Sequence, residues 1–381
     1  MRVLLFSVSI GAGHDLAAQG IAKEIQRRAP AAQIELVDTF NYINPVLNKV
    51  VVESYMETIK FTPKVWGYLY DKAGKGEHIA DMSQVFNSLF SQKMHKKVQD
   101  FQPDILIASH AFPCGMLSLM KEKHRLNIPL VAIITDYHIH PFWFHQHIDR
   151  YIIPSDQLKF TLLERGVKPE QIWSFGLPLR EEFSNIPNPQ EAKAQLGLSE
   201  KTTLLIMGGG LGLGSIERIV KNLRIRELDL QIVVITGKNE ALRRKLEKST
   251  GANTLIVKGF VHDMALHIAA ADVIISKPGG LTVAEVLSSK KPFILLSPIP
   301  GQEEKNAEFL LNHGLAIKVS DPRDILLALQ QLFNCPLRVK HIQDMAETIG
   351  KPYAAVSSVD GIFKELLHDN LNEQTPSDEY A

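Results

Sequence analysis

The sequence of 381 residues has little cysteine, no excess of either charge and no long apolar run. Only Cys114 and Cys335 are present, without metal-ligand spacing, which argues against a disulfide framework or a zinc site. The 42 Lys and Arg residues balance 42 Asp and Glu residues, so no general attraction to nucleic acid is expected. No stretch reaches the roughly 18 apolar residues of a spanning helix. The composition therefore predicts a cytoplasmic protein whose apolar N-terminus is a buried strand.

Short β-branched segments alternate with amphipathic helical stretches, and this alternation occurs twice along the chain. Such alternation is typical of a parallel sheet covered by helices on both faces. The sequence therefore predicts an α/β protein with two doubly wound domains. The predicted strands are 3–8, 34–40, 104–109, 130–135 and 151–154 in the first series, and 203–207, 231–236, 254–260, 272–276, 292–297 and 315–319 in the second.

The domain boundaries follow from where the first series of strands and helices ends and the second begins. Residues 177–197 are polar and contain three prolines, which suit neither a helix interior nor a central strand, so we predict a linker at 181–198. The first domain then spans 1–180 and the second 199–368, with a last helix that can pack back on the first domain and a disordered tail at 369–381. A helical insertion at about 41–100 either packs on the first sheet or faces a membrane.

The first motif that carries chemistry follows the first predicted strand. Gly11 and Gly13 precede His14, and a helix whose apolar residues recur at helical spacing is predicted to begin near Asp15. Open α/β sheets bind ligands at the carboxyl ends of their strands, which is where this histidine falls. The full dinucleotide fingerprint is absent because its sixth position is Leu16. His14 is therefore either an ordinary residue at a helix start or a catalytic base.

A second motif in the same domain combines a carboxylate with imidazoles. Asp136, His138 and His140 lie within five residues just after a predicted strand, followed by Trp143. A carboxylate and an imidazole so close can orient one another and provide a base near neutral pH. The alternative is a polar loop whose aromatic residues fill the core, or form an apolar lip for a lipid chain.

The second domain carries three glycine-containing turns, each at the end of a predicted strand. Gly208-Gly209-Gly210 lacks the Lys-Ser/Thr of a nucleotide triphosphatase loop. Gly279-Gly280 opens a helix that contains Thr282 and Glu285, so a diphosphate can lie on the helix N-terminus while the carboxylate takes two vicinal hydroxyls. The third turn, 297–306, is rich in side chains that can bond sugar hydroxyls.

These motifs, in this order, resemble a known group of lipid-acting enzymes. The chain is similar to the monogalactosyldiacylglycerol synthases and the bacterial processive diacylglycerol glucosyltransferases, which are GT-B, family 28-like glycosyltransferases. The resemblance covers nearly the whole chain. It rests on Gly11-x-Gly13-His14, Thr135-Asp136-x-x-x-His140-x-x-Trp143, Gly176-x-Pro178, Gly259-Phe260-Val261, Lys277-Pro278-Gly279-Gly280-x-Thr282-x-x-Glu285 and Pro300-Gly301-Gln302-Glu303-x-x-Asn306.

The resemblance implies two Rossmann-like domains facing a cleft, and a role for each matched residue. His14 and Asp136 become catalytic candidates, and Phe260 with Val261 is expected to hold a uracil. Glu285 is expected to bind ribose hydroxyls. Gly209, Gly279, Gly280 and Thr282 are assigned to the diphosphate, Gln302, Glu303 and Asn306 to the hexose, and Gly13, His140, Trp143, Tyr55, Trp66 and Tyr68 to the acceptor or the membrane.

The expected activity is inverting transfer of a hexose from UDP-glucose or UDP-galactose to diacylglycerol. No cofactor is expected, and no metal, because no Asp-x-Asp suits a divalent cation. The aromatic segment 55–70 with its lysines predicts peripheral binding to an anionic membrane, at the cytoplasmic face. Two alternatives stay open, a polyprenyl-linked or other lipid acceptor, and an inactive regulator that binds nucleotide sugars.

Overall fold

The computed structural model describes residues 1–9, 12–45, 92–210, 212, 214–225, 227–296 and 298–367. These residues form two sheets of six strands each, and every strand pairs parallel with its neighbours. The predicted α/β class with two doubly wound domains is confirmed. Tyr55, Trp66 and Tyr68, most of the predicted insertion and the predicted tail lie outside the described residues.

The first sheet has the strand order β2-β1-β3-β4-β5-β6. It is covered on both faces, because Val3 and Leu5 of β1 pack into one buried cluster while Leu4 and Phe6 pack into another. The strand β6 was not predicted, since two residues are too short for a periodic signal. The strands are β1 (Arg2–Ser7), β2 (Gln33–Asp38), β3 (Ile105–Ala108), β4 (Leu130–Ile133), β5 (Arg150–Ile152) and β6 (Ile172–Trp173).

Helices surround this sheet. The strand predicted at 34–40 ends at Asp38, because the Asp38 side chain accepts a hydrogen bond from the Asn41 backbone N–H and caps a helix there. Residues 41–45 and 92–100 of the predicted insertion are described, and the helix at 92–101 packs Met94 and Val98 into the core. The other helices are α1 (Gly13–Arg28), α2 (Thr39–Ile43), α6 (Ala111–His124) and α7 (Leu158–Glu164), with short 3-10 turns η1 (Pro141–Trp143) and η2 (Pro169–Gln171).

The second sheet has the order β12-β11-β10-β7-β8-β9, which is the doubly wound order of a dinucleotide-binding sheet. All six of its strands lie within two residues of their predicted bounds. The strands are β7 (Thr202–Met207), β8 (Leu230–Ile235), β9 (Thr254–Lys258), β10 (Val273–Ser276), β11 (Phe293–Leu296) and β12 (Ala316–Val319). The helices are α9 (Ile216–Arg224), α10 (Glu240–Glu247), α11 (Met264–Ala270), α12 (Gly280–Ser288), α13 (Gln302–Asn312), α14 (Ile325–Phe333) and α15 (Pro336–Ile349), with the 3-10 turn η4 (Pro322–Asp324).

The proline-rich segment between the sheets contains more regular structure than the sequence suggested. After the short turn η3 (Glu181–Phe183), helix α8 (Pro189–Leu196) packs against α11 of the second domain. Pro189 takes the first helical position, where its missing N–H costs nothing, and the Asn188 side chain caps the helix by accepting from the Glu191 N–H at 2.9 Å. The prolines therefore start a helix here instead of excluding one.

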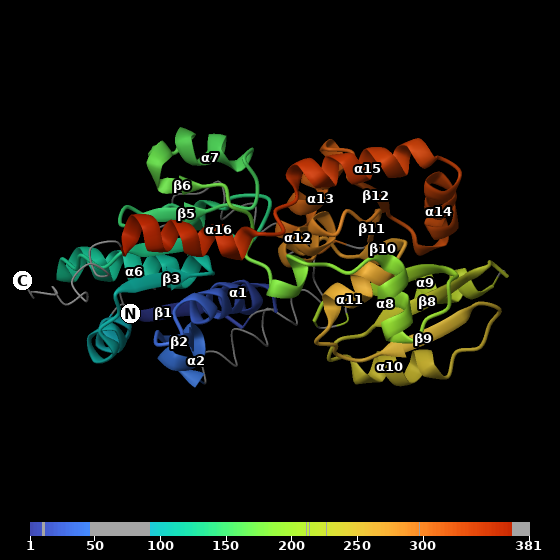
Figure 1. Cartoon of the computed structure of the whole chain (residues 1–381), viewed down its shortest axis with the longest axis horizontal. Helices are drawn as coiled ribbons and strands as arrows, with labels where there is room; N and C mark the ends of the chain where they lie inside the picture. Colours follow the sequence, from blue (N-terminus) through green and yellow to red (C-terminus); the bar gives the residue numbers. More distant parts are fainter. Residues whose placement is uncertain are drawn as a thin grey trace, which may run out of the picture.

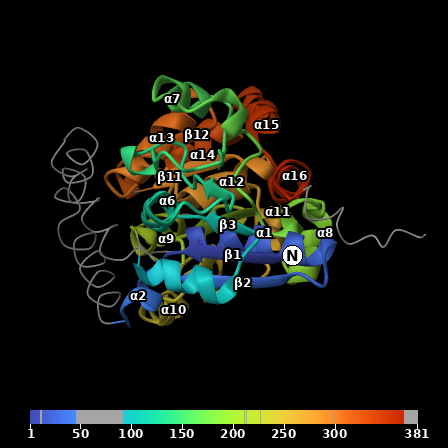
Figure 2. The same ribbon diagram turned by 90° about the vertical axis from the view of Figure 1, so that its left-hand side faces the viewer.

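The C-terminal helices return to the first domain. Helix α16 (Ala354–Gly361), followed by the π-helical turn η5 (Ile362–Leu366), packs along α1 and lies over the first domain in Figures 1 and 2. An ion pair joins Arg28 of α1 to Asp360, and a second joins Arg150 to Glu365 at 3.0 Å. The end of the chain therefore crosses back to the first domain beside the linker, where the Ser184 hydroxyl donates to the Pro352 carbonyl at 2.9 Å.

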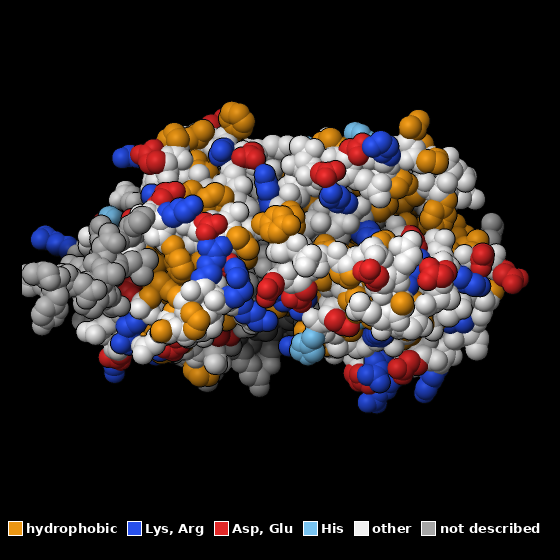
Figure 3. Space-filling model, viewed as in Figure 1, with side chains coloured by type: hydrophobic (Ala, Val, Ile, Leu, Met, Phe, Trp, Pro, Cys, Tyr) orange, Lys and Arg blue, Asp and Glu red, His pale blue; other side chains and the backbone are white. Residues whose placement is uncertain are grey.

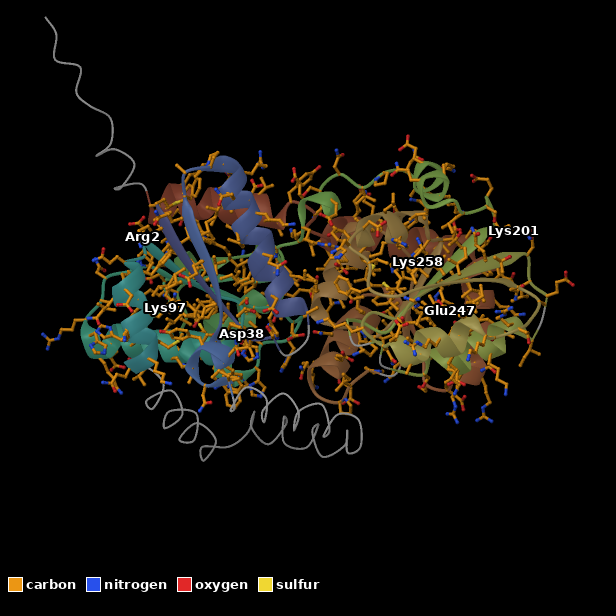
Figure 4. The ribbon with its side chains drawn as sticks, turned by 90° about the horizontal axis from the view of Figure 1, so that it is seen from below. Arg2, Asp38, Lys97, Lys201, Glu247 and Lys258 are labelled. Atoms are coloured by element: carbon orange, nitrogen blue, oxygen red, sulfur yellow. The ribbon has the colours of Figure 1, made fainter. Side chains whose placement is uncertain are left out.

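The carboxyl ends of the two sheets face each other. In Figure 4, Arg2 at the start of β1 and Lys201 just before β7 lie toward opposite ends of the molecule, whereas Asp38 and Lys258, at the ends of β2 and β9, lie nearer the middle. The strand order reverses between β1 and β3 in the first sheet and between β7 and β10 in the second. Ligands of open α/β sheets bind at such reversal points, so the fold predicts one site between the domains.

The surface carries both signs of charge. On the face drawn in Figure 3, Lys and Arg side chains are interspersed with Asp and Glu, in keeping with the balanced composition.

Within the described ranges, no helix has the length and apolar character needed to cross a bilayer.

Candidate functional site

His14 lies at the carboxyl end of β1, in the first turn of α1. The Asp15 carboxylate fixes this turn, because it accepts hydrogen bonds from the hydroxyls of Ser7 and Ser9, the latter at 2.9 Å. An acidic residue in the first turn also suits the positive end of the helix dipole. The His14 ring is half-buried and points across the sheet toward the loop that follows β3.

The hydrogen bonds of His14 define its tautomer. Its Nδ1 lies 2.7 Å from the backbone carbonyl oxygen of Ser109 and 3.1 Å from the Thr135 hydroxyl. A carbonyl oxygen can only accept, so Nδ1 carries the proton in the neutral ring and Nε2 has a free lone pair. The arrangement holds a neutral imidazole ready to take a proton at Nε2.

His110, to which the sequence assigned no role, lies beside His14. The two rings meet edge to face with centroids 4.5 Å apart. The His110 Nδ1 accepts from the Phe112 N–H at 3.2 Å and caps α6, which requires an unprotonated Nδ1. Desolvation, together with the nearby His14, lowers the pKa of His110 well below its ordinary value. The only local signal for this residue was its place directly after the third predicted strand.

The Asp136 carboxylate is bonded at the interface between the domains. Its Oδ1 accepts from the Asn306 side chain at 2.9 Å, whereas the ring of His14 is oriented by the Ser109 carbonyl. The catalytic role expected for Asp136 stays a prediction. The loop after β4 directs the Asp136 carboxylate across the cleft, toward α13 of the second domain.

Asn306 joins the two domains, and its expected contact with a hexose is not supported by its surroundings. It is fully buried. Its Oδ1 accepts from the Tyr137 backbone N–H at 2.8 Å, and its Nδ2 donates to Asp136 and to the Pro278 carbonyl at 3.0 Å. Because both ends of the amide are used within the protein, Asn306 positions the first domain against the β10–α12 turn.

Glycines allow the facing edges to approach closely. A Cβ built on Gly280 would lie 1.8 Å from the Thr135 carbonyl oxygen, so only glycine fits there. A Cβ on Gly210 would lie 3.3 Å from the Cβ of Ala12, which is a tight contact, and one on Gly13 would lie at an ordinary 3.6 Å from the Cβ of Leu281. The structure therefore brings the His14 turn against the glycine turns of the second sheet.

The glycine turns after β7 and β10 lie side by side. Gly209 adopts a φ of +68°, which favours glycine, and a Cβ on it would lie 3.9 Å from the Cε of Lys277. Gly279 precedes α12, and no side chain caps the N–H groups at the start of this helix. Glu303, expected to face a sugar, forms an ion pair with Lys277 at 2.7 Å.

Glu285 is a buried carboxyl group on α12, one turn beyond the half-buried Thr282. Its relative exposure is 7%, and burial raises its pKa to about 7, an effect that the positive charge of Arg180 opposes. A carboxyl group with such a pKa is partly ionised near neutral pH. In its ionised form, Glu285 can accept hydrogen bonds from hydroxyl groups.

The remaining residues assigned to the donor differ in exposure. The Gln302 Oε1, at the start of α13, is buried and has no hydrogen-bond partner among the described residues, which leaves an acceptor for a ligand. Phe260 is exposed by 49%, and Val261 is half-buried. Phe260 thus presents exposed aromatic surface beyond the end of β9, beside the ring of His262.

Trp143 and His140 lie in the core of the first domain. Trp143 is 5% exposed and packs in the same cluster as Ile139 and Tyr151, and the Nδ1 of His140 caps the turn η1. Of the two interpretations of these aromatic residues, core filler is correct for Trp143, because its ring is enclosed by that cluster. The membrane assignments of Tyr55, Trp66 and Tyr68 fall outside the described residues.

No group of three or more His, Cys, Asp or Glu side chains that could hold a metal ion occurs in the described ranges. The site thus consists of an imidazole on one sheet edge and, on the facing edge, glycine turns, a helix N-terminus, a lysine and carboxyl groups. Two doubly wound domains that meet in this way define the GT-B class of glycosyltransferases.

The comparisons with known proteins agree with this class. Residues 14–179 match the family model of monogalactosyldiacylglycerol (MGDG) synthase, and residues 203–346 match the C-terminal domain of glycosyltransferase family 28. One match falls in each domain, and the resemblance drawn from the sequence is confirmed.

Curated relatives and solved structures give the same result. The chain is 27% identical over 370 residues to proteins named processive diacylglycerol beta-glucosyltransferase from Bacillus thuringiensis and Bacillus cereus, covering 96% of this chain and 94% of theirs. Its fold is similar to that of MurG from Acinetobacter baumannii, with a TM-score of 0.58, 17% identity and coverage of 95% and 99%. It is also similar to the calicheamicin glycosyltransferase CalG4, with a TM-score of 0.60, 15% identity and coverage of 96% and 99%.

Proposed function

We propose that the protein transfers a hexose from a UDP-sugar to diacylglycerol, with inversion at the anomeric carbon. The observation that carries this proposal is the His14 ring, whose Nε2 is free to accept a proton next to the glycine turns of the second sheet. The names of the Bacillus relatives support diacylglycerol as acceptor and glucose as the sugar.

The proposed reaction is a single displacement. His14 Nε2 takes the proton from the acceptor hydroxyl while that oxygen forms a bond to C1 of the sugar. The bond from C1 to the diphosphate oxygen breaks, and its electron pair leaves with UDP. Because attack and departure occur on opposite faces, an α-linked donor gives a β-linked product. The Ser109 carbonyl stabilises the imidazolium that forms, through the Nδ1–H.

The donor is proposed to lie along the second sheet. The free N–H groups at the start of α12 and the glycine turn after β7 receive the diphosphate. Glu285 binds the ribose hydroxyls, and the exposed Phe260 with Val261 covers the uracil. The unpaired Gln302 Oε1 accepts from a sugar hydroxyl.

Incubation with diacylglycerol vesicles and either UDP-glucose or UDP-galactose, followed by mass spectrometry and NMR of the lipid, tests this proposal. The expected product is a β-linked hexosyl diacylglycerol, formed faster from UDP-glucose. An α-linked product would exclude the single displacement. Product with polyprenyl phosphate lipids and none with diacylglycerol would identify a different acceptor, and absence of turnover with UDP binding intact would indicate a regulator.

We also propose that transfer needs no metal ion and occurs at the cytoplasmic face of a membrane to which the protein binds peripherally. Transfer is expected to continue unchanged with EDTA in excess, since protein groups receive the diphosphate. Flotation with vesicles should recover more protein when the lipids are anionic than when they are neutral. Loss of activity with EDTA would contradict metal independence. Equal flotation with both lipids would contradict binding to an anionic membrane surface.

A further inference from the structure

An ion pair between Lys277 and Glu303 occupies the reversal point of the second sheet. Lys277 is the first residue after β10, and Glu303 lies in the first turn of α13. The Lys277 Nζ donates to the Glu303 Oε1 at 2.7 Å, and the two side chains are only 12% and 11% exposed. Burying such a pair costs desolvation energy, whereas burying a pair of apolar side chains does not. Stability alone therefore does not explain why a charged pair occupies this position.

The pair lies between the two glycine turns assigned to the diphosphate. The Lys277 Cε is 3.9 Å from where a Cβ of Gly209 would be, and the Glu303 Oε1 is 3.9 Å from where a Cβ of Gly279 would be. The glycines leave this side of the pair open to a ligand. Anything bound at both turns would therefore contact the ammonium directly.

Glu303 holds the lysine in one orientation. Its second oxygen, Oε2, accepts from the Ile299 backbone N–H at 2.7 Å, so the carboxylate is fixed at both ends. An ammonium has three N–H donors, and among the described residues Glu303 is the acceptor that the structure provides for it. The remaining donors of Lys277 are available to an anion.

We propose that Lys277 binds the donor diphosphate and that Glu303 is its positioning residue. This inference rests on the proposed function, because it assumes a nucleotide diphosphate at the glycine turns. Charge-assisted hydrogen bonds of this kind are stronger than neutral ones. As the C1–O bond breaks and its electron pair moves onto UDP, the negative charge beside Lys277 grows, so the contact strengthens when the leaving group departs.

A simpler role for Lys277 makes a different prediction. If the lysine only neutralises Glu303, removing both charges together leaves no unpaired ion, and the binding of UDP is retained. If the lysine contacts the diphosphate, the double variant binds UDP as weakly as the single one. Uridine separates the two cases further, since it has no phosphate and cannot report on the ammonium.

The experiment is calorimetric titration of UDP and uridine into four proteins, the wild type, Lys277→Met, Lys277→Met with Glu303→Gln, and Lys290→Met. Lys290 forms a 2.7 Å surface pair with Glu347, with exposures of 48% and 65%, and serves as the control. We expect UDP affinity to fall about 10- to 100-fold in the single and the double variants, with uridine affinity unchanged. The control should match the wild type.

Two results would overturn the inference. One is wild-type UDP affinity in the double variant, which would assign Lys277 to charge neutralisation alone. The other is an equal loss of uridine and UDP affinity, which would indicate general damage to the site, and the melting temperature of each variant checks for it. Failure of the wild type to bind UDP would instead contradict the proposed function itself.

Discussion

The two sheets use the same topological position for different chemistry. Between β1 and β3, the first sheet presents the imidazoles of His14 and His110, and the ring of His14 is oriented by a backbone carbonyl. Between β7 and β10, the second sheet presents glycine turns, a helix N-terminus and the Lys277–Glu303 pair. A half-site built from neutral rings suits proton transfer, whereas one built from N–H groups and an ammonium suits an anion.

This difference teaches why the two domains are not interchangeable despite their similar architecture. The first half-site needs a group that is neutral before the reaction, and desolvation keeps the neighbouring His110 neutral as well. The second needs fixed positive partners, which glycine turns provide because they expose backbone N–H groups. Variants that affect one half and spare the other can test this division.

The largest expected effect is that of His14→Ala. Without the base, transfer to diacylglycerol should fall about 10²- to 10⁴-fold, while UDP affinity measured by calorimetry stays within about twofold, because the donor lies on the other sheet. His313→Ala, at the C-cap of α13 in the second domain, is a control for loss of an imidazole, since its Nδ1 contacts the Phe309 carbonyl of that helix. Near-normal transfer by His14→Ala would remove this residue from the role of base.

The next effect concerns the contact between the halves. A Cβ at position 280 would lie 1.8 Å from the Thr135 carbonyl oxygen, so Gly280→Ala should force the edges apart and reduce kcat/KM by about 100-fold. Thr348→Ala is the control, since its exposed hydroxyl bonds only the Asp344 carbonyl within α15, away from the site. Small-angle scattering should detect the opening. Equal kinetics for the two variants would show that close approach at Gly280 is unimportant.

A third prediction concerns the pH dependence of stability. The pKa of Glu285 rises from 4.5 to about 7 on folding, so the native state holds more protons than the unfolded state between these values. Stability is then lost as pH rises through this window, and the loss is complete above about pH 7. Glu285→Gln should therefore exceed the wild type by about 1 to 3 kcal/mol at pH 8 and match it at pH 4.

Urea unfolding of Glu285→Gln and of the wild type at both pH values measures this difference. Glu347→Gln, at an exposed position, is the control and should show little change at either pH. A constant difference between wild type and Glu285→Gln at the two pH values would mean that folding does not raise the pKa of this carboxyl group.

The smallest effect is expected at His110. Asparagine can still cap α6, so His110→Asn should keep the fold and lower transfer by only a few-fold. Loss of the ring removes the edge-to-face contact that packs the His14 imidazole, so the loss is expected in kcat, with UDP affinity unchanged. His110→Ala also loses the cap, and its stability should drop by about 1 kcal/mol, which asparagine restores. An unchanged kcat in both variants would leave His110 a purely structural residue.

The sequence alone determined the strands, the glycine turns and the place of His14. Buried strands of a parallel sheet are continuous apolar runs, and glycines at their ends mark turns, so both leave local signals. The two errors in the predicted secondary structure also arose from local features. The two-residue strand β6 was too short to detect, and Pro189 was taken for a helix breaker although it starts one.

Only the tertiary structure decided which partners these residues have. His14 is oriented by Ser109, 95 residues away, and Asn306 contacts Asp136, 170 residues away, across the interface between the domains. Lys277 and Glu303 meet because the ends of β10 and β11 are neighbours in the sheet. Spacing along the chain carries no information on which edges will face each other, since that depends on how two complete sheets pack.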